Sequence, residues 1–522
     1  MKTRFNLLAF AISFFLLSCG DNTNTDKVIA PSLETVPTGS SVTIPDDILD
    51  GSMPPYDLER NASVLDGALF AWREMIALSW QSTYSDATIE RGQPDLSWTY
   101  AQGTPKNPLV WETYAHRIEY RPKGDSIKKD FNSKPSYPFV NESQIHWNGI
   151  DPSEQFIVLD EDNEIGSCYV FAKPNITKVT PDNKLVMYMA KVNEIEYNYR
   201  KKYFNSHSKL ENAQNKISMT GEKGLDLLKE ISTYKGSLTD PCGANYYGKQ
   251  GLIVYPCSDE STKQRGVIEI KTAWRPLSGT DNQDEFLVRD AIVFDKSGDS
   301  TNAIYTANKV SYVLIGMHII HKTNNFRNFF IATWEHNSVE NYGYKFVIDN
   351  PPSPASEEDY KIISVERHDD ADGAHSYISE AYNTISSAIQ AKIKKANPDN
   401  PNFLANYRLT GFQSDLYPND QLKDRKKLMP AYYLANLVIE SDSTLADFSG
   451  SSADDPFNDG NNVVVDGKFI TAGGCAGCHG AAQVKGRDFS FLNDNFEKPV
   501  PYPDVVSLNE DEIKAILPDS LR

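Results

Sequence analysis

The side chains best suited to chemistry lie near the C-terminal end, where Cys475, Cys478 and His479 form the stretch "CAGCH". Chance placement of the chain's six cysteines and nine histidines predicts about 0.001 occurrences of this pattern. Two thiols at this spacing on an incipient helix form thioethers to both vinyl groups of one haem, and the adjacent imidazole then lies under the iron. The pattern therefore predicts one covalently bound haem c, with His479 as the proximal ligand.

Two other kinds of site use a similar spacing. A thioredoxin-like dithiol follows a strand in a βαβ unit, whereas the approach to Cys475 is the Gly-rich stretch "TAGG". Half of a zinc site would need further ligands, and residues 480–522 contain neither Cys nor His. Covalent haem is the favoured interpretation, with the dithiol and the zinc site as alternatives.

A resemblance to a known family extends beyond this motif. The segment "CAGCHGAAQVKGRDFSF" resembles the C-terminal haem segment of large bacterial cytochrome c family lipoproteins. Stretches similar to the body of that family are "FAWREMIALSWQS", "PLVWETYAHRIEY", "IEIKTAWRPL", "VLIGMHIIHKTN", "IATWEHNSVEN" and "YYLANLVIES". The resemblance spans Leu69 to Phe491 and implies an exported, haem-binding, electron-transferring protein with His479 as proximal ligand. It implies no substrate.

The haem pocket requires residues from the upstream chain. Small cytochromes c commonly take their second axial ligand from a methionine after the motif, but the last methionine here is Met429, before it. Residues 309–340 are predicted to form a β-hairpin that carries His318, His321 and His336. These three histidines and Met429 are the candidates for the distal ligand. The alternative for each is an ordinary role as a hydrogen-bonded sheet histidine or a core methionine.

Strand geometry separates the candidates in the hairpin. Along an extended strand His321 shares a face with Met317, whereas His318 points to the opposite face. Beyond the motif, Phe489 and Phe491 are candidates to pack against the porphyrin, and plain core packing is their alternative.

The N-terminus predicts export. Lys2 and Arg4 precede an apolar run, Phe5–Leu17, that is too short to span a bilayer stably. The following "LLSC" resembles the lipobox of bacterial lipoproteins, which implies that Cys19 carries the lipid and anchors the chain to a membrane. An ordinary cleaved signal with an incidental cysteine is the alternative. The expected location is the periplasm or cell envelope.

The remaining cysteines are Cys168, Cys242 and Cys257. An exported protein can form disulfides, and Cys242 and Cys257 flank a short Gly-containing segment. We expect these two to pair, which leaves Cys168 as a buried thiol.

Composition excludes one class of partner. The sequence has 52 basic and 71 acidic residues, for a formal net charge of -19, and it contains no basic stretch. A surface of this charge repels phosphate backbones, so nucleic-acid binding is not expected.

Periodicity predicts an α+β fold: N-terminal helices and a mainly antiparallel β-sheet body, with a small, mostly α C-terminal haem lobe. The expected organisation is a signal peptide over 1–18, a flexible tether over 19–61, the body over 62–440 and the haem lobe over 441–522. Helices are expected over 63–82, 108–120, 183–234 in two or three pieces, 376–396 and 507–520. Strands are expected in 251–255, 267–274, 285–294, 309–340, 406–413 and 431–441.

Three functions agree with these features. The first is an exported, lipid-anchored c-type haem protein that passes electrons to a redox partner protein. The second is a haem-dependent, peroxidase-like oxidoreductase with a substrate cleft in the body. The third is a binding lipoprotein in which the haem is structural. The nature of the distal pocket distinguishes the first two.

Overall fold

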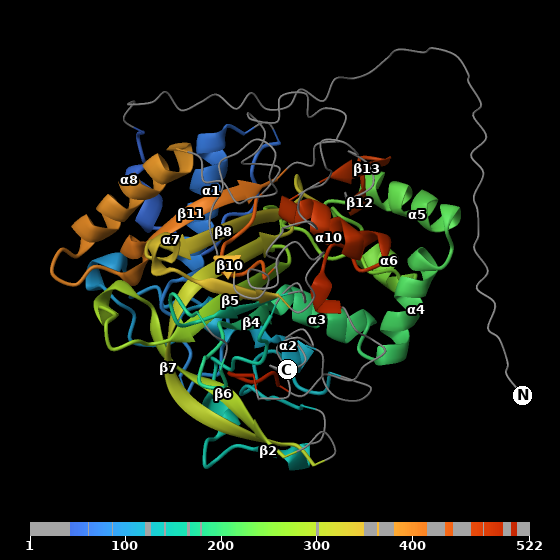
Figure 1. Ribbon diagram of the computed structural model, residues 1–522. Coiled ribbons are helices and arrows are strands. Elements are labelled where there is room, and N and C mark those ends of the chain that lie inside the picture. The colour runs from blue at the N-terminus through green and yellow to red at the C-terminus, as the bar shows by residue number, and fades with distance from the viewer. Residues whose placement is uncertain are drawn as a thin grey trace, which may run out of the picture.

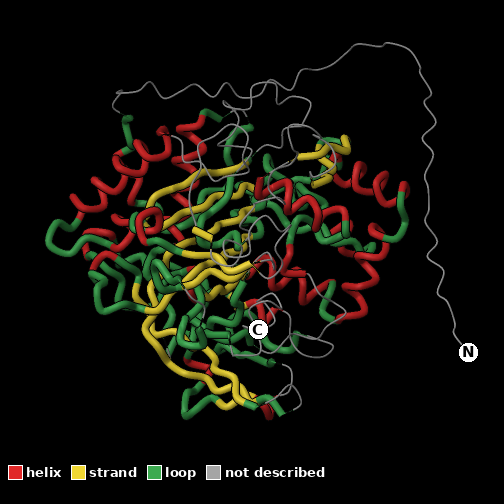
Figure 2. The backbone as a smooth tube through the Cα atoms, in the orientation of Figure 1, coloured by secondary structure: helices red, strands yellow, loops and turns green. Residues whose placement is uncertain are grey.

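The computed structural model describes residues 42–60, 62–85, 87–120, 127–139, 142–163, 168–177, 180–298, 302–348, 363–364, 380–414, 434–441, 461–472, 474–493 and 503–508. Long strands run through the middle of the molecule and helices lie on both sides of them (Figure 1). The tube view shows the same arrangement, with extensive loops between the regular elements (Figure 2). The signal peptide, Cys19 and Met429 lie outside the described residues.

The main sheet has eight strands, six of which follow the order β1-β4-β5-β7-β8-β11. Their bounds are β1 Ala115–His116, β4 Met187–Val192, β5 Ile268–Pro276, β7 Ile304–His321, β8 Phe330–His336 and β11 Tyr407–Gln413. All pairings along this path are antiparallel. Two further strands pair with β7: β6 (Val288–Ser297) antiparallel and β2 (Ile145–His146) parallel.

Smaller elements surround this sheet. A second sheet joins β10 (Ile363–Ser364), β9 (Lys345–Ile348) and β3 (Cys168–Phe171), and β12 (Asn461–Val465) forms a hairpin with β13 (Lys468–Ala472). The α-helices among the described residues are α1 Val64–Leu78, α2 Arg117–Tyr120, α3 Glu194–Tyr203, α4 His207–Ser218, α5 Glu222–Thr233, α6 Ala244–Lys249, α7 Val339–Tyr342, α8 Glu380–Ala396 and α10 Gly474–Val484.

Helices α1 and α8 cover one face of the sheet (Figure 1). Helix α1 begins with a capping box, in which the Ser63 side chain accepts from the Asp66 N–H and the Asp66 carboxylate accepts from the Ser63 N–H. Its buried side includes Trp72, which packs edge-on against Trp334 of β8 with ring centroids 6.4 Å apart. Both indoles are fully buried, so this contact anchors α1 to the centre of the sheet.

The opposite face of the sheet meets the C-terminal motif. Ile320 of β7 and Ile331 of β8 share one apolar cluster with Cys475 and Ala476 of α10. Figure 1 shows α10 beside the helices α5 and α6. This face of β7 and β8 therefore positions the motif.

The predicted α+β class with a mainly antiparallel sheet is confirmed. The helix begun by Ser63, the breaks near Asn205 and Gly221 and the β7–β8 hairpin are also found. Residues 183–234 open with a strand, β4, before their three helices. The predicted helix at 507–520 falls mostly outside the described residues.

The predictions for residues 108–120 and 251–255 are wrong. Residues 108–120 do not form one helix but a 3-10 turn, the short strand β1 and α2, and the Leu109 N–H donates to the Glu112 carboxylate instead of continuing a helix. Residues 251–255 form no strand, because side chains take the place of a strand partner. The Tyr199 hydroxyl accepts from the Val254 N–H at 3.1 Å, and Asp488 accepts from the Tyr255 N–H.

A separate haem lobe is not confirmed. The hairpin β12–β13 precedes α10, so the described part of the segment 441–522 is not mostly helical. Leu492, Val506 and Leu508 belong to the largest cluster of the body, and Phe489 packs with Phe329 of the body. The C-terminal residues that the structure describes therefore share the core of the body.

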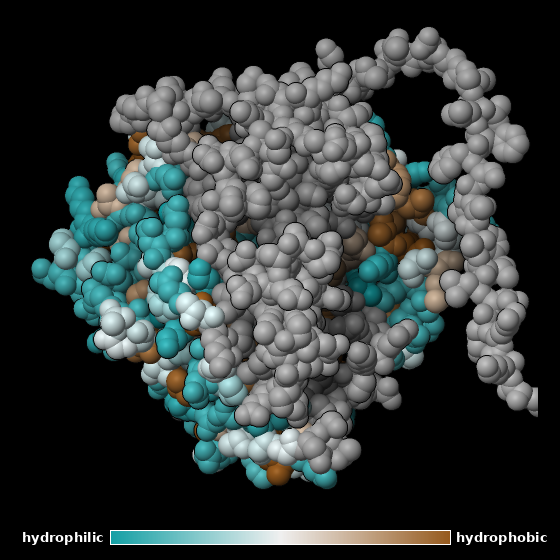
Figure 3. All heavy atoms as spheres, viewed as in Figure 1, coloured by the Kyte–Doolittle hydropathy of each residue, from teal (hydrophilic) through white to brown (hydrophobic). Residues whose placement is uncertain are grey.

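The described surface in Figure 3 is mainly hydrophilic, with a smaller hydrophobic area at the right of that view. Within the described ranges, no helix combines the length and the apolar character needed to cross a membrane.

Candidate haem site

The motif lies at the start of α10, which three side-chain contacts hold in place. Gln413, the last residue of β11, accepts from the Ala476 N–H at 2.8 Å. Further along, Gln483 accepts from the Val464 N–H at 2.7 Å and donates to the Val464 carbonyl at 2.8 Å. The first contact fixes α10 on the main sheet, and the other two fix it on the β12–β13 hairpin.

The two motif cysteines are on the same helix and are not joined by a disulfide. Cys475 is 3% exposed, and its Sγ lies 3.0 Å from the Leu434 carbonyl oxygen. Burial raises the pKa of Cys475 well above its usual value. Reactive dithiols depend on a lowered thiol pKa. In addition, β13 pairs antiparallel with β12 before α10, so the described residues around the motif form no βαβ unit. Both observations disfavour the dithiol alternative.

A backbone carbonyl orients the imidazole of His479. Its Nδ1 lies 2.5 Å from the Phe489 carbonyl oxygen. Because that oxygen only accepts, Nδ1 carries the proton, and Nε2 of the neutral ring keeps its lone pair. Burial lowers the pKa of His479 to about 4, with a smaller contribution from the charge of Lys271. The ring is therefore neutral at pH 7, and Nε2 has the form that binds a metal.

An aromatic ring flanks the same imidazole. Phe491 packs edge-on against His479 with centroids 5.0 Å apart, whereas Phe489 is buried against Phe329. Of the two aromatic residues singled out in the sequence, Phe491 lies beside the proposed ligand and Phe489 supplies core packing and the orienting carbonyl.

Among the distal candidates, His318 lies on the face of the sheet that meets α10. It is paired across β5 and β7 with Lys271, and it is 4% exposed. The charges of His318 and Lys271 both act on the pKa of His479, which places all three in one electrostatic environment. Nε2 of His318 is 2.9 Å from Oε1 of Glu440, at ion-pair distance but without hydrogen-bond geometry, and it has no hydrogen-bond partner among the described residues.

Glu440 is a site residue that sequence reasoning missed. The sequence predicts a strand over 431–441, but residues 434–440 form a loop that docks on the sheet through side chains. Asn436 donates to the Thr333 hydroxyl at 2.8 Å, and the Leu437 N–H donates to Glu335 at 2.8 Å. These contacts replace a strand ladder and bring Glu440 to His318. The sequence feature that marks Glu440 is its position as the single carboxylate at the end of the apolar run "LANLVIE".

The other candidates are engaged elsewhere or not described. Both ring nitrogens of His321 have partners, Glu74 and Ser258. Those of His336 contact the Ser338 hydroxyl at 2.7 Å and the Glu285 carbonyl at 3.2 Å. His321 lies on the opposite face of β7 from His318, as strand geometry predicts. Met429 lies outside the described residues.

The donor set fits a c-type haem. Two reduced thiols and a neutral imidazole with a fixed tautomer stand on one helix, and the buried Nε2 of His318 has no hydrogen-bond partner in the described part of the chain. Over the same residues, no group of three or more His, Cys, Asp and Glu side chains is arranged to hold a metal ion by itself.

The predicted cysteine pair is present as a disulfide between Cys242 and Cys257, with their Cα atoms 5.9 Å apart. Cys168 begins β3.

Comparisons of the chain with protein-family models, with curated proteins and with solved structures found no match.

Proposed function

We propose that this chain is an exported, lipid-anchored c-type haem protein that transfers electrons. The observation that carries the proposal is the orientation of His479, whose Nδ1 is held by the Phe489 carbonyl while Nε2 keeps its lone pair. A metal-binding histidine typically donates the N–H of its other ring nitrogen to a carbonyl or carboxylate oxygen in this way. Cys475 and Cys478 precede it on the same helix at the spacing of thioether attachment.

Each part of the chain has a role in this proposal. A bound haem supplies reversible one-electron chemistry at its iron. Cys475 and Cys478 attach it, and His479 orients it from the proximal side. The apolar cluster of β7, β8 and α10 buries Cys475 and Ala476 and packs against the half-buried Cys478. Cys19 holds the protein at a membrane, where a redox partner protein exchanges electrons with it.

We assign His318 as the second axial ligand. It is the distal candidate on the face of β7 that meets α10, and its Nε2 lacks a hydrogen-bond partner in the described ranges. Two protein ligands would favour electron transfer, because the iron would then have no position open to a substrate.

A second candidate function, peroxidase-like chemistry, is favoured by one observation. Glu440 lies 2.9 Å from Nε2 of His318 and would compete with a haem iron for that nitrogen. A histidine and a carboxylate beside an open position form an acid–base pair for a small oxidant. The spin state of the iron in the resting protein decides between the two functions.

The test uses the full chain matured in a host that attaches haem c. A pyridine haemochrome spectrum and the intact mass report covalent haem, and optical and electron paramagnetic spectra report the spin state. We expect one covalent haem per chain and a low-spin iron. A high-spin iron that binds added ligands would favour the second candidate, and a mass without haem would refute both.

A further inference from the structure

A hydroxyl, an imidazole and a carboxylate from three elements form a hydrogen-bonded line on the other side of the sheet from the haem site. Ser258 Oγ lies 2.8 Å from Nε2 of His321, and Nδ1 of His321 lies 2.5 Å from Oε1 of Glu74. His321 ends β7, Glu74 is on α1, and Ser258 precedes β5. The order hydroxyl–imidazole–carboxylate is that of a nucleophile, a base and its orienting acid.

The neighbouring hydrogen bonds fix where the protons are. The Gly266 N–H donates to Ser258 Oγ at 2.8 Å, so the hydroxyl's own proton is directed to Nε2 of His321. Nε2 then accepts, and Nδ1 carries the proton that it donates to Glu74. This tautomer is the one in which His321 can remove a proton from Ser258.

Ser258 lies at the wall of a large cleft. The cleft has a volume of about 1370 Å³, and its lining includes Ser258, Leu69, Phe70 and Leu238. Phe70 stacks on the ring of His321, with centroids 6.2 Å apart, and Leu238 is 83% exposed. Ser258 itself is only 1% exposed, and the cleft that it lines is the route by which a substrate would approach it. Leu69, Phe70 and Leu238 give the cleft an apolar wall that suits an apolar acyl group, and its polar lining includes Asp57 and Glu260.

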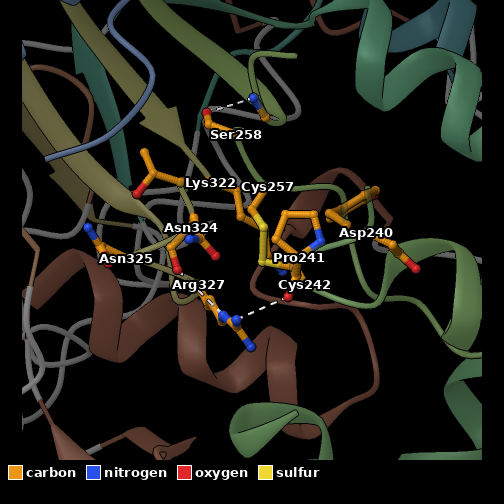
Figure 4. Close-up of a disulfide and its surroundings, with 12 residues drawn as sticks. Asp240, Pro241, Cys242, Cys257, Ser258, Lys322, Asn324, Asn325 and Arg327 are labelled. Carbon is orange, nitrogen blue, oxygen red and sulfur yellow. Dashed lines mark hydrogen bonds between the residues drawn. A yellow bond between two sulfur atoms is a disulfide. The ribbon is translucent and has the colours of Figure 1, made fainter. Parts of the chain in front are cut away.

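Covalent and hydrogen-bonded contacts hold the serine in place. Cys257, its neighbour, is joined to Cys242 (Figure 4). Arg327 donates to the Pro241 carbonyl at 3.0 Å, next to the disulfide (Figure 4). The Ser258 N–H donates to the Lys322 carbonyl at 3.0 Å. A fixed nucleophile is a requirement of this chemistry, because small displacements lower the rate strongly.

We propose that the cleft is a second functional site, which hydrolyses carboxylic esters with an apolar acyl group. Ser258 is the nucleophile, His321 the general base and Glu74 a positioning residue. Asn324 also lines the cleft, and its carboxamide would donate to the ester carbonyl oxygen.

The reaction has two balanced steps. In the first, Ser258 Oγ bonds to the acyl carbon and its proton passes to Nε2 of His321, which gives that proton to the departing alkoxide and releases the alcohol. In the second, His321 takes a proton from water, the hydroxide attacks the acyl-serine, and the carboxylic acid leaves as the proton returns to Ser258.

The first test is covalent labelling of the intact, haem-loaded protein with an alkyl fluorophosphonate, followed by peptide mass spectrometry. We expect one adduct, on Ser258. Ser258→Ala should abolish it. Ser338→Ala is the matched control. Ser338 also hydrogen bonds with a histidine, His336, but the other ring nitrogen of His336 contacts the Glu285 carbonyl and not a carboxylate. This variant should label like the wild type.

The second test measures hydrolysis of p-nitrophenyl butyrate. Ser258→Ala and His321→Gln should each lower kcat at least about 10²-fold. Glu74→Gln should lower kcat and change its pH profile with KM nearly constant. The site is refuted if the wild type forms no adduct or forms it elsewhere, and equally if hydrolysis is unchanged in a folded Ser258→Ala variant. The adduct on the wild type decides the matter even if a variant does not fold.

Discussion

Nε2 of His318 and Oε1 of Glu440 lie 2.9 Å apart, although they come from a central strand and from a loop far along the chain. Asn436 holds that loop through the Thr333 hydroxyl and the Trp334 carbonyl. The loop thus places a carboxylate on the imidazole that we assign as the distal ligand. The two candidate functions give this pair different roles: His318 binds the iron in electron transfer, whereas His318 and Glu440 form an acid–base pair in the peroxidase-like reaction.

Replacing His318 tests its role as an axial ligand. His318→Ala should convert a low-spin iron to a high-spin one that binds added imidazole, because one axial position is left open. Optical and electron paramagnetic spectra provide the measurement. His336→Gln is the control, since both nitrogens of His336 are engaged away from α10, and its spectrum should match the wild type.

Glu440→Gln distinguishes the two candidate functions. If His318 binds the iron, this change should leave the iron low-spin, because the carboxylate is not a ligand. If the iron has an open position, the change should slow the reaction with peroxide by about 10²-fold or more, because the acid–base pair is lost. Stopped-flow spectroscopy with hydrogen peroxide provides the measurement.

Attachment of the haem should depend on both motif thiols. We expect the mature wild-type chain to be heavier than its polypeptide and lipid by one haem, and a double Cys475→Ser, Cys478→Ser variant to lack that mass. The control is the double Cys242→Ser, Cys257→Ser variant, in which the disulfide is lost but attachment should continue. Equal masses for the motif variant and the wild type would contradict covalent haem.

Acid should destabilise the protein through His336. Burial lowers the pKa of this histidine from 6.5 to about 4. Between these two values the unfolded state binds the extra proton, so the free energy of unfolding falls as the pH falls. The loss amounts to about 3 kcal/mol at most, at 1.36 kcal/mol per pKa unit. Urea denaturation at pH 7 and pH 4 should show a smaller loss for His336→Gln than for the wild type.

The buried ion pair between Lys322 and Asp488 should be essential for stability. Lys322 follows the last residue of β7, and Asp488 precedes Phe489 in the chain. The side chains of Lys322 and Asp488 are 2% and 8% exposed. Lys322→Met leaves a buried carboxylate without its cation and should cost about 3–5 kcal/mol in urea denaturation. Because Phe489 orients His479, haem incorporation should fall as well.

An exposed pair and a double variant serve as controls for that prediction. Lys201 and Asp130 form an ion pair with 28% and 86% exposed side chains. Lys201→Ala should therefore change the free energy of unfolding by less than about 1 kcal/mol. Lys322→Met combined with Asp488→Leu should recover part of the loss, because neither charge is then buried alone. A loss of similar size for both single lysine variants would show that burial of the pair is unimportant.

The sequence by itself predicts the chemistry of the motif, and it determined the character of the elements around it. Cys475, Cys478 and His479 are adjacent in the chain, so their spacing alone predicts the cofactor. The hairpin of β7 and β8 and the face assignment of His318 follow from period-two alternation, which is a local property of a strand. Ser63 marks the start of α1 for the same reason, because a cap depends only on neighbouring residues.

Only the tertiary structure decided which distant residues meet. Glu440 reaches His318 because side chains of Asn436 and Glu335 replace strand hydrogen bonds, and no periodicity records such contacts. Glu74, His321 and Ser258 are brought together by the packing of α1 on the sheet and by the disulfide next to Ser258. Long-range contacts of this kind depend on the burial of whole elements, whereas a sequence pattern carries only local preferences.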